Sequence, residues 1–252
     1  MIEQSDTKLA GRRRVYLMRH GHVDYFAPGL SDPRSVPLTE KGQEQARAAA
    51  EALAAVRFDI AAHSGLPRTI QTLDIVLSGR THMPPIIESP GLEELKSGWL
   101  KAENREELAA RLAFCFDGAD APGARFLPDG EKFTDAQARI VGALQSLVLE
   151  GASWRTALVV AHEGVNRIAL GWACGGGLAT VSAFEQDLAC VNVIDFDVTP
   201  AAGGDGFVVE RAIIKALNVT PYDYVKHGLP KTSLEHLFDV DFGRARPAVP
   251  GG

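Results

Sequence analysis

The chain has 252 residues, with 26 Lys and Arg against 32 Asp and Glu, and a formal net charge of -6 at pH 7. This length suffices for a large buried core, and because no composition break marks a linker, we expect one α/β domain. An acidic chain lacks the basic face that displaces counterions from phosphates, so we expect no nucleic-acid partner. No apolar run approaches the ~20 residues of a membrane span, which predicts no membrane partner either.

The two ends of the chain and its cysteines bear on domain organisation and location. Residues 1–13 are mostly polar, without the apolar stretch of a secretory signal, and are expected to form a flexible leader. A single domain is expected over 14–240, followed by a flexible tail over 241–252. The three cysteines share no CxxC-type spacing, which predicts neither a disulfide framework nor a thiolate metal cluster. These features favour a reducing compartment, and we expect a cytoplasmic protein.

Apolar strand patterns alternate with helical patterns along the chain, as is typical of an α/β fold. Thr39 is expected to cap a helix, since Glu40 and Gln43 follow it, and Pro67 is expected in the first turn of the next helix. The predicted strands cover 14–19, 58–62, 84–88, 156–161, 190–198 and 207–217, and the predicted helices begin at 40, 67, 104, 132 and 164.

Two of the predicted strands end in a histidine. The run Val15–Met18 leads into Arg19-His20-Gly21, and the strongest buried-strand pattern of the chain, Thr156–Ala161, leads into His162. In open α/β sheets the carboxyl ends of the strands face the ligand crevice, so we expect both histidines at that edge. Gly21 is expected to let the backbone turn sharply behind His20, and we also expect it among the phosphate-binding residues.

Two arginines accompany these histidines and point to a phosphoryl ligand. Arg68 lies in the first turn of a predicted helix, where the helix dipole disfavours a cation unless an anion is bound there. Together with Arg19, His20 and His162 it would form a pocket for a dianion, because guanidinium groups bind phosphate oxygens bidentately. We assign no acidic cluster of the sequence to magnesium. We therefore expect phosphoryl transfer without a metal or an organic cofactor, and with one histidine as nucleophile.

The ordered segments resemble the histidine phosphatase superfamily, whose fold is that of phosphoglycerate mutase. Its members share RHG, PLTxxGxxQA, SxLxRxxQT, LxE and a late strand that ends in His, in that order. The resemblance runs from about residue 14 to residue 174. In this sequence the segments are Arg19-His20-Gly21, Pro37-Leu38-Thr39-Glu40-Lys41-Gly42-Gln43-Glu44-Gln45-Ala46, Ser64-Gly65-Leu66-Pro67-Arg68-Thr69-Ile70-Gln71-Thr72, Leu92-Glu93-Glu94 and Ala161-His162.

The resemblance implies a three-layer α/β/α sandwich with a mostly parallel central sheet, and a phosphohistidine intermediate on His20. It implies that Arg19, Arg68 and His162 hold the phosphoryl oxygens, where charge needs stabilising during transfer. Glu94, by its place in LxE, would protonate the leaving alkoxide and then accept a proton from the attacking water.

The expected activity is hydrolysis of a small phosphorylated metabolite, which releases inorganic phosphate. One alternative is phosphotransfer of the phosphoglycerate mutase type, and another is a non-catalytic protein that binds a phosphorylated ligand on the same fold. The sequence leaves open whether the protein forms a homodimer.

The loop after RHG departs from the pattern of many family members, which carry Thr two residues after the glycine and Asn three residues further on. Here these places hold Val23 and Phe26, so the loop has lost polar contacts and gained apolar surface. This predicts a substrate other than that of the best-known members. Asp24 is a candidate for orienting substrate, with a solvated loop carboxylate as the alternative.

Glu163 is the second departure, because Gly is common after the late histidine. A carboxylate there would repel a second phosphate, raise the pKa of His162, or bind a substrate hydroxyl or amine. Another branch of the superfamily places its proton donor at this position, so Glu163 is the alternative to Glu94 as general acid. Gly164 opens a predicted helix whose backbone N–H groups would extend the anion site. Arg167, in the same turn, either contacts substrate or pairs with Glu163.

Overall fold

The computed structural model describes residues 10–25, 27–30, 32–97, 111–150, 154–203 and 206–238. Its strands form one six-stranded sheet in the order β3-β2-β4-β1-β5-β6. Strands β3, β2, β4 and β1 pair in parallel, while β5 pairs antiparallel with both β1 and β6. The strands are β1 (Gly11–Arg19), β2 (Ile60–His63), β3 (Ile86–Glu88), β4 (Thr156–Ala161), β5 (Val191–Pro200) and β6 (Phe207–Val219).

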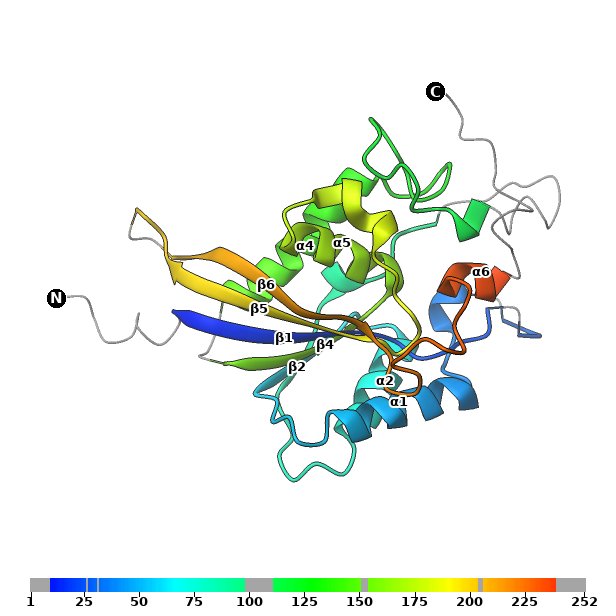
Figure 1. Cartoon of the computed structure of the whole chain (residues 1–252), viewed down its shortest axis with the longest axis horizontal. Coiled ribbons are helices and arrows are strands. Elements are labelled where there is room, and N and C mark those ends of the chain that lie inside the picture. The colour runs from blue at the N-terminus through cyan, green and yellow to red at the C-terminus, as the bar shows by residue number, and fades with distance from the viewer. Residues whose placement is uncertain are drawn as a thin grey trace.

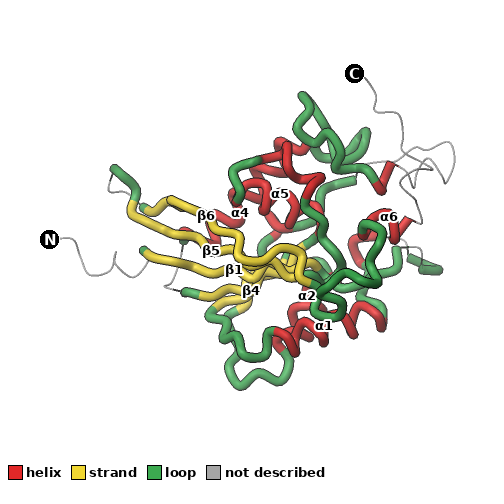
Figure 2. The backbone as a smooth tube through the Cα atoms, in the orientation of Figure 1, coloured by secondary structure: helices red, strands yellow, loops and turns green. Residues whose placement is uncertain are grey.

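Helices cover both faces of this sheet, α1 and α2 on one side and α4 and α5 on the other (Figure 1). The same three layers are visible in the backbone trace, with the strands between the two groups of helices (Figure 2). The predicted three-layer α/β/α sandwich is therefore confirmed. The helices are α1 (Glu40–Ala52), α2 (Pro67–Leu77), α4 (Phe133–Leu149), α5 (Glu163–Ala173) and α6 (Ser233–Phe238), with short 3-10 helices at Pro33–Ser35, Pro90–Leu92 and Gly177–Ala183.

Alternate residues of the central strands supply the two cores. In β4, Val159 packs with the α4 and α5 side of the core, where Ile140 and Ile168 also lie. Its neighbour Val160 packs with the α1 and α2 side, together with Leu73. Because β4 is covered on both faces, its residues are apolar throughout, which explains why this strand had the strongest pattern in the sequence. The structure places it at Thr156–Ala161, as predicted.

The predicted flexible leader is wrong at its last residues, because β1 begins at Gly11. The strand extends this far because Arg12 and Arg14 form ion pairs of 2.7 Å with Asp197 and Asp195 on the adjacent strand β5. Between them Arg13 is fully buried, with its guanidinium 4.9 Å from the centre of the Trp154 ring. Residues 1–9 and the predicted tail over 241–252 lie outside the described residues.

Other element boundaries differ from the sequence predictions for local reasons. Strand β2 begins at Ile60 rather than at Phe58, because the Asp59 carboxylate accepts hydrogen bonds from the N–H groups of Arg155 and Thr156. Of the helix predicted over 104–116, residues 104–110 lie outside the described residues, and 111–113 are helical before the chain turns. The sequence patterns predicted neither α6 nor the 3-10 helix at Gly177–Ala183. Within the described ranges, no helix is both long and apolar enough to cross a bilayer.

Two glycines bring helix α1 against the loop that follows β1. A Cβ on Gly21 would lie 2.4 Å from the carbonyl oxygen of Gly42, and one on Gly42 would lie 2.2 Å from that of His22. Gly21 does not have a positive φ, so its role is this close approach rather than the sharp turn that we expected. Gln45 of α1 reinforces the contact by accepting the N–H of His22 at 2.9 Å.

We expect Gly42→Ala to lower the free energy of unfolding by about 1–3 kcal/mol, because the new methyl group overlaps backbone that cannot move without shifting the His20 loop. Gly142→Ala is the matched control, since it adds the same methyl group to helix α4, where no atom lies within 4 Å. This control is expected to leave stability unchanged or to raise it by up to about 1 kcal/mol. Urea unfolding gives the free energy of unfolding of both variants. Equal changes in the two variants would contradict a stabilising role for the contact between Gly42 and the His20 loop.

Candidate functional site

The two histidines predicted at the sheet edge lie next to each other. Arg19 of β1 is the register partner of Ala161 of β4, so His20 and His162 follow paired residues on adjacent parallel strands. Their ring centres are 5.2 Å apart with an interplanar angle of 66°. Both side chains are almost fully buried, which fixes their orientation relative to one another.

His20 is held as a neutral imidazole with Nε2 available. Its Nδ1 lies 2.8 Å from the carbonyl oxygen of Gly21, and since a carbonyl can only accept, Nδ1 carries the proton. Burial, together with the charges of Arg68 and Arg19, lowers the pKa of His20 well below its ordinary value. The N–H of Gly21 donates to Thr72 Oγ1 at 3.1 Å, so the backbone of Gly21 orients His20 and is not free to bind phosphate as we had predicted.

His162 has one ring nitrogen bound and one without a partner. Its Nε2 lies 2.8 Å from Ser64 Oγ, at the end of β2, whereas Nδ1 is buried and has no hydrogen-bond partner among the described residues. Burial and the charge of Arg68 lower the pKa of His162, so the expected upward shift by Glu163 is wrong. The sequence motif contains Ser64, but its spacing alone did not assign this contact.

Arg19 and Arg68 each have a buried Nε atom without a hydrogen-bond partner in the described part of the chain. Arg19 uses Nη1 for the carbonyl oxygen of Gln186 and for Ser233 Oγ on α6. Arg68 uses Nη1 for the carbonyl oxygen of Pro33 at 3.3 Å. Buried N–H donors are rarely left unpaired in proteins, so the two guanidinium Nε atoms beside His20 form a cradle suited to an anion.

Glu94 lies on the loop after the 3-10 helix Pro90–Leu92 and reaches the start of α5. Its carboxylate accepts from the N–H of Leu95 at 3.0 Å and from that of Gly164 at 3.4 Å. A Cβ on Gly164 would lie 2.8 Å from Glu94 Oε1, so this glycine makes room for the carboxylate. Burial is the largest effect on Glu94 and raises its pKa, with Glu163 acting in the same direction.

Glu163 lies between two arginines rather than standing free. Its Oε1 is 2.8 Å from Arg167 Nη2 and its Oε2 is 2.9 Å from Arg19 Nη1, and the side chain is buried. Arg167 also pairs with Glu185 at 2.9 Å, which resolves the open alternative in favour of ion pairing. Asp24 is exposed and does not line the cavity at the site, whereas its neighbour Tyr25 does.

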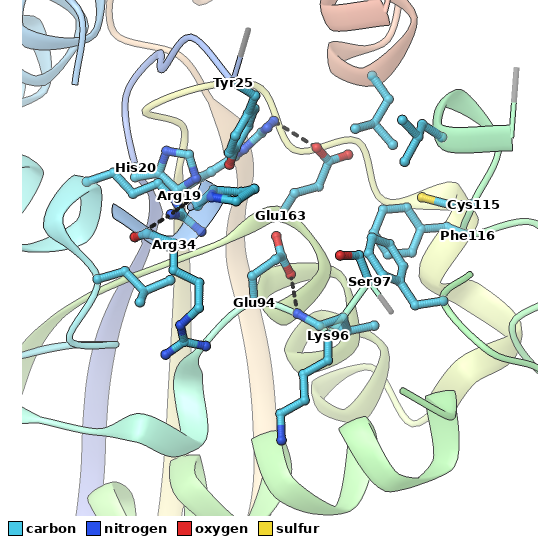
Figure 3. Close-up of a pocket in the computed structure, with 17 residues that line it drawn as sticks. Arg19, His20, Tyr25, Arg34, Glu94, Lys96, Ser97, Cys115, Phe116 and Glu163 are labelled. Atoms are coloured by element: carbon cyan, nitrogen blue, oxygen red, sulfur yellow. Dashed lines mark hydrogen bonds and ion pairs between the residues drawn. The ribbon is translucent and has the colours of Figure 1, made fainter. Parts of the chain in front are cut away.

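A cavity of about 580 Å³ opens beside these groups. Figure 3 shows His20, Arg19 and Tyr25 on one side of it and Phe116 and Cys115 on the other, with the carboxylates of Glu163 and Glu94 between them. The sequence patterns did not identify the apolar wall, because its residues come from separate segments. That wall consists of Leu66, Leu95, Leu112, Cys115, Phe116, Phe126 and Leu234. No three His, Cys, Asp or Glu residues in the described ranges are grouped so that they could hold a metal ion.

Comparisons with known proteins agree on the family. A family model described as the histidine phosphatase superfamily (branch 1) matches residues 15–201. The chain is 31% identical to the adenosylcobalamin/α-ribazole phosphatase of Escherichia coli, over 73% of this chain and 90% of that protein. It is 33% identical to a 2,3-bisphosphoglycerate-dependent phosphoglycerate mutase of Gloeobacter violaceus, over 62% of this chain and 73% of the relative.

A solved structure supports the same relationship. The crystal structure of the α-ribazole phosphatase of Shigella flexneri superimposes with a TM-score of 0.61 at 26% identity, covering 81% of this chain and 96% of that one. The family model spans both strands that end in histidine, together with Arg19, Arg68 and Glu94. Because the match covers most of the chain and contains the whole anion cradle, the protein belongs to branch 1 of the histidine phosphatase superfamily.

Proposed function

We propose that the protein hydrolyses the phosphomonoester of a small metabolite, with His20 as the nucleophile. The observation that carries the proposal is the arrangement, within the described residues, of two buried guanidinium N–H donors and one buried imidazole nitrogen, all without a partner, around a neutral His20. These are Arg19 Nε, Arg68 Nε and His162 Nδ1. Donors held in place by burial stabilise the charge that develops on the phosphoryl oxygens without reorganising during the reaction.

The reaction has two half-reactions. In the first, the Nε2 lone pair of His20 attacks phosphorus while the bond to the alcohol oxygen breaks, and the Glu94 carboxyl group donates its proton to the departing alkoxide. In the second, the Glu94 carboxylate takes a proton from water as the water oxygen attacks phosphorus. The bond to Nε2 then breaks, which releases inorganic phosphate and restores His20 and the protonated Glu94.

Hydrolysis is favoured over transfer to a second substrate by the charge of the pocket. Glu163 projects a carboxylate into the cavity, which opposes the doubly phosphorylated ligand that a mutase must hold. Val23, where relatives often carry Thr, is buried against Val36 and Leu38 and offers no polar contact. Phe26, the other departure in this loop, lies outside the described residues.

We also propose a cytoplasmic location. Cys115, Cys174 and Cys190 are all free thiols, which fits a reducing compartment. The expected partners are the phosphorylated metabolite and, as product, inorganic phosphate.

Incubation with a ³²P-labelled phosphomonoester is expected to label the protein on His20, as an acid-labile and base-stable phosphohistidine. His20→Ala is expected to lose this label and about three or more orders of magnitude in kcat, because it removes the nucleophile. His82→Ala is the matched control, since this histidine is exposed and outside the cavity. Label that persists in His20→Ala, or appears on another residue, would contradict the assignment.

The pH profile of kcat/KM is expected to be bell-shaped. Activity falls at low pH as His20, whose pKa is lowered, becomes protonated and loses its lone pair. It falls at high pH as Glu94, whose pKa is raised, loses the proton that the leaving group needs. Initial rates across pH for a substrate with an alkyl leaving group measure both limbs.

Glu94→Gln is expected to lower kcat/KM for an alkyl phosphate about 10²–10⁴-fold and to remove the alkaline limb. The loss is expected to be much smaller with 4-nitrophenyl phosphate, whose leaving group departs without a proton. Glu163→Gln serves as the comparison and is expected to keep the alkaline limb. If Glu163→Gln lost that limb and Glu94→Gln kept it, Glu163 would be the general acid.

A further inference from the structure

The cavity is polar on the side of His20 and apolar on the far side. Figure 3 shows Phe116 and Cys115 facing the cavity across Glu163 and Glu94 from His20. Leu112, Phe126 and Leu234 extend this surface. A phosphoryl group held by Arg19 and Arg68 would therefore direct its ester oxygen past the two carboxylates and its alcohol half toward the apolar wall.

Among the described residues, the buried charges at the cavity nearly balance one another. Glu163 is paired with Arg19 and Arg167, and Glu185 is paired with Arg167, so these four residues carry no net charge and Arg68 adds one positive charge for the phosphoryl group. Buried carboxylates repel a further carboxylate or phosphate at close range, since screening by water is weak there.

Two further cations among the described residues line the cavity at its rim. Arg34 is exposed and forms a 2.8 Å ion pair with Glu93. Lys96 is exposed and directs its ammonium group away from Glu94 and Glu163, as Figure 3 shows. Within the described residues, neither cation is placed to receive an anionic group at the apolar wall.

We infer that the alcohol half of the substrate is an uncharged apolar group and carries no second anion. This inference rests on the proposed phosphomonoesterase function and names the substrate class. Leu112 and Leu234 are two wall residues whose side chains are only partly buried, which makes them suitable for testing the wall. Phe116 is less suitable for testing, because it also packs against Arg167 and Phe133.

A series of n-alkyl phosphates from ethyl to octyl tests the inference, because the leaving-group pKa hardly changes along it. We expect kcat/KM to rise up to about fourfold for each methylene group until the wall is covered. A six-carbon phosphate that ends in a carboxylate is expected to react at least about tenfold more slowly than hexyl phosphate. A flat series, or equal rates for the carboxylate and the hexyl ester, would overturn the inference.

Variants of the wall residues test which side chains cause the dependence of kcat/KM on chain length. Leu112→Ser and Leu234→Ser are expected to flatten the dependence of kcat/KM on chain length. Leu217→Ser is the matched control, because Leu217 is exposed on β6 and does not line the cavity, and it is expected to keep the wild-type slope. Glu163→Gln is expected to raise the rate ratio of the carboxylate ester to hexyl phosphate. An unchanged slope in both wall variants would place the apolar contact elsewhere.

Binding of n-alkylphosphonates, which cannot be hydrolysed, separates this inference from the proposed function. Calorimetric affinity that rises with chain length would support the apolar site even if no phosphomonoester were hydrolysed, in which case only the proposed function fails. Hydrolysis of every alkyl phosphate at one rate, with phosphonate affinity independent of chain length, would support the proposed function and overturn the inference. Absence of both hydrolysis and binding would overturn both.

Discussion

The parallel pairing of β1 with β4 determines the geometry of the whole site. With Arg19 opposite Ala161, the residues that follow the two strands are His20 and His162, and their ring centres lie 5.2 Å apart. Side chains alternate between faces of a sheet, so a slip of one residue would exchange the α1 and α2 core for the α4 and α5 core along an entire strand. The two apolar layers thus hold the register, and the register holds the histidines together.

Burying cations at this edge has a cost that the neighbouring carboxylates offset. Arg19 and Arg167 are almost fully buried, and an unpaired buried charge destabilises a fold by about 3–5 kcal/mol. Glu163 contacts both guanidinium groups, and Glu185 holds Arg167 from the side of the 3-10 helix Gly177–Ala183. Glu163, at a position where Gly is common in the family, therefore helps to position Arg19. Its carboxylate also presents a negative charge to a substrate in the cavity.

Local patterns predicted the parts of the fold that depend on local residues. Strand β4 has the predicted bounds, helix α2 begins at the predicted residue, and Thr39 caps α1 as expected, because burial on two faces and capping leave direct traces in composition. The contacts that depend on distant residues were missed. Arg12 and Arg14 extend β1 because they pair with aspartates of β5 that lie about 180 residues away in the sequence. Ser233 contacts Arg19 from a short helix that has no periodic pattern.

The candidate site shows the same division. The residue pattern predicted Arg19, His20, Arg68 and His162 as one site, since each lies at the end of a strand or the start of a helix, and the resemblance to the family added Glu94. The roles of the glycines could not be predicted in this way. Gly21 and Gly164 both lie where predicted, yet each makes space for a neighbour, Gly42 in one case and Glu94 in the other. Close approach between segments depends on packing, which no spacing in the sequence encodes.

One environment shifts the two titrating groups of the proposed mechanism in opposite directions. Burial disfavours the charged form of each group, which means the imidazolium for His20 and the carboxylate for Glu94. The same buried surroundings therefore favour the unprotonated form of the proposed nucleophile and the protonated form of the proposed acid, as a pair of groups with separated roles requires. Arg68 and Arg19 strengthen the first shift and oppose the second, because they repel the imidazolium and attract the carboxylate. Glu163 forms an ion pair with Arg19, and its negative charge raises the pKa of Glu94. This departure from the family pattern therefore favours the protonated form of the proposed acid.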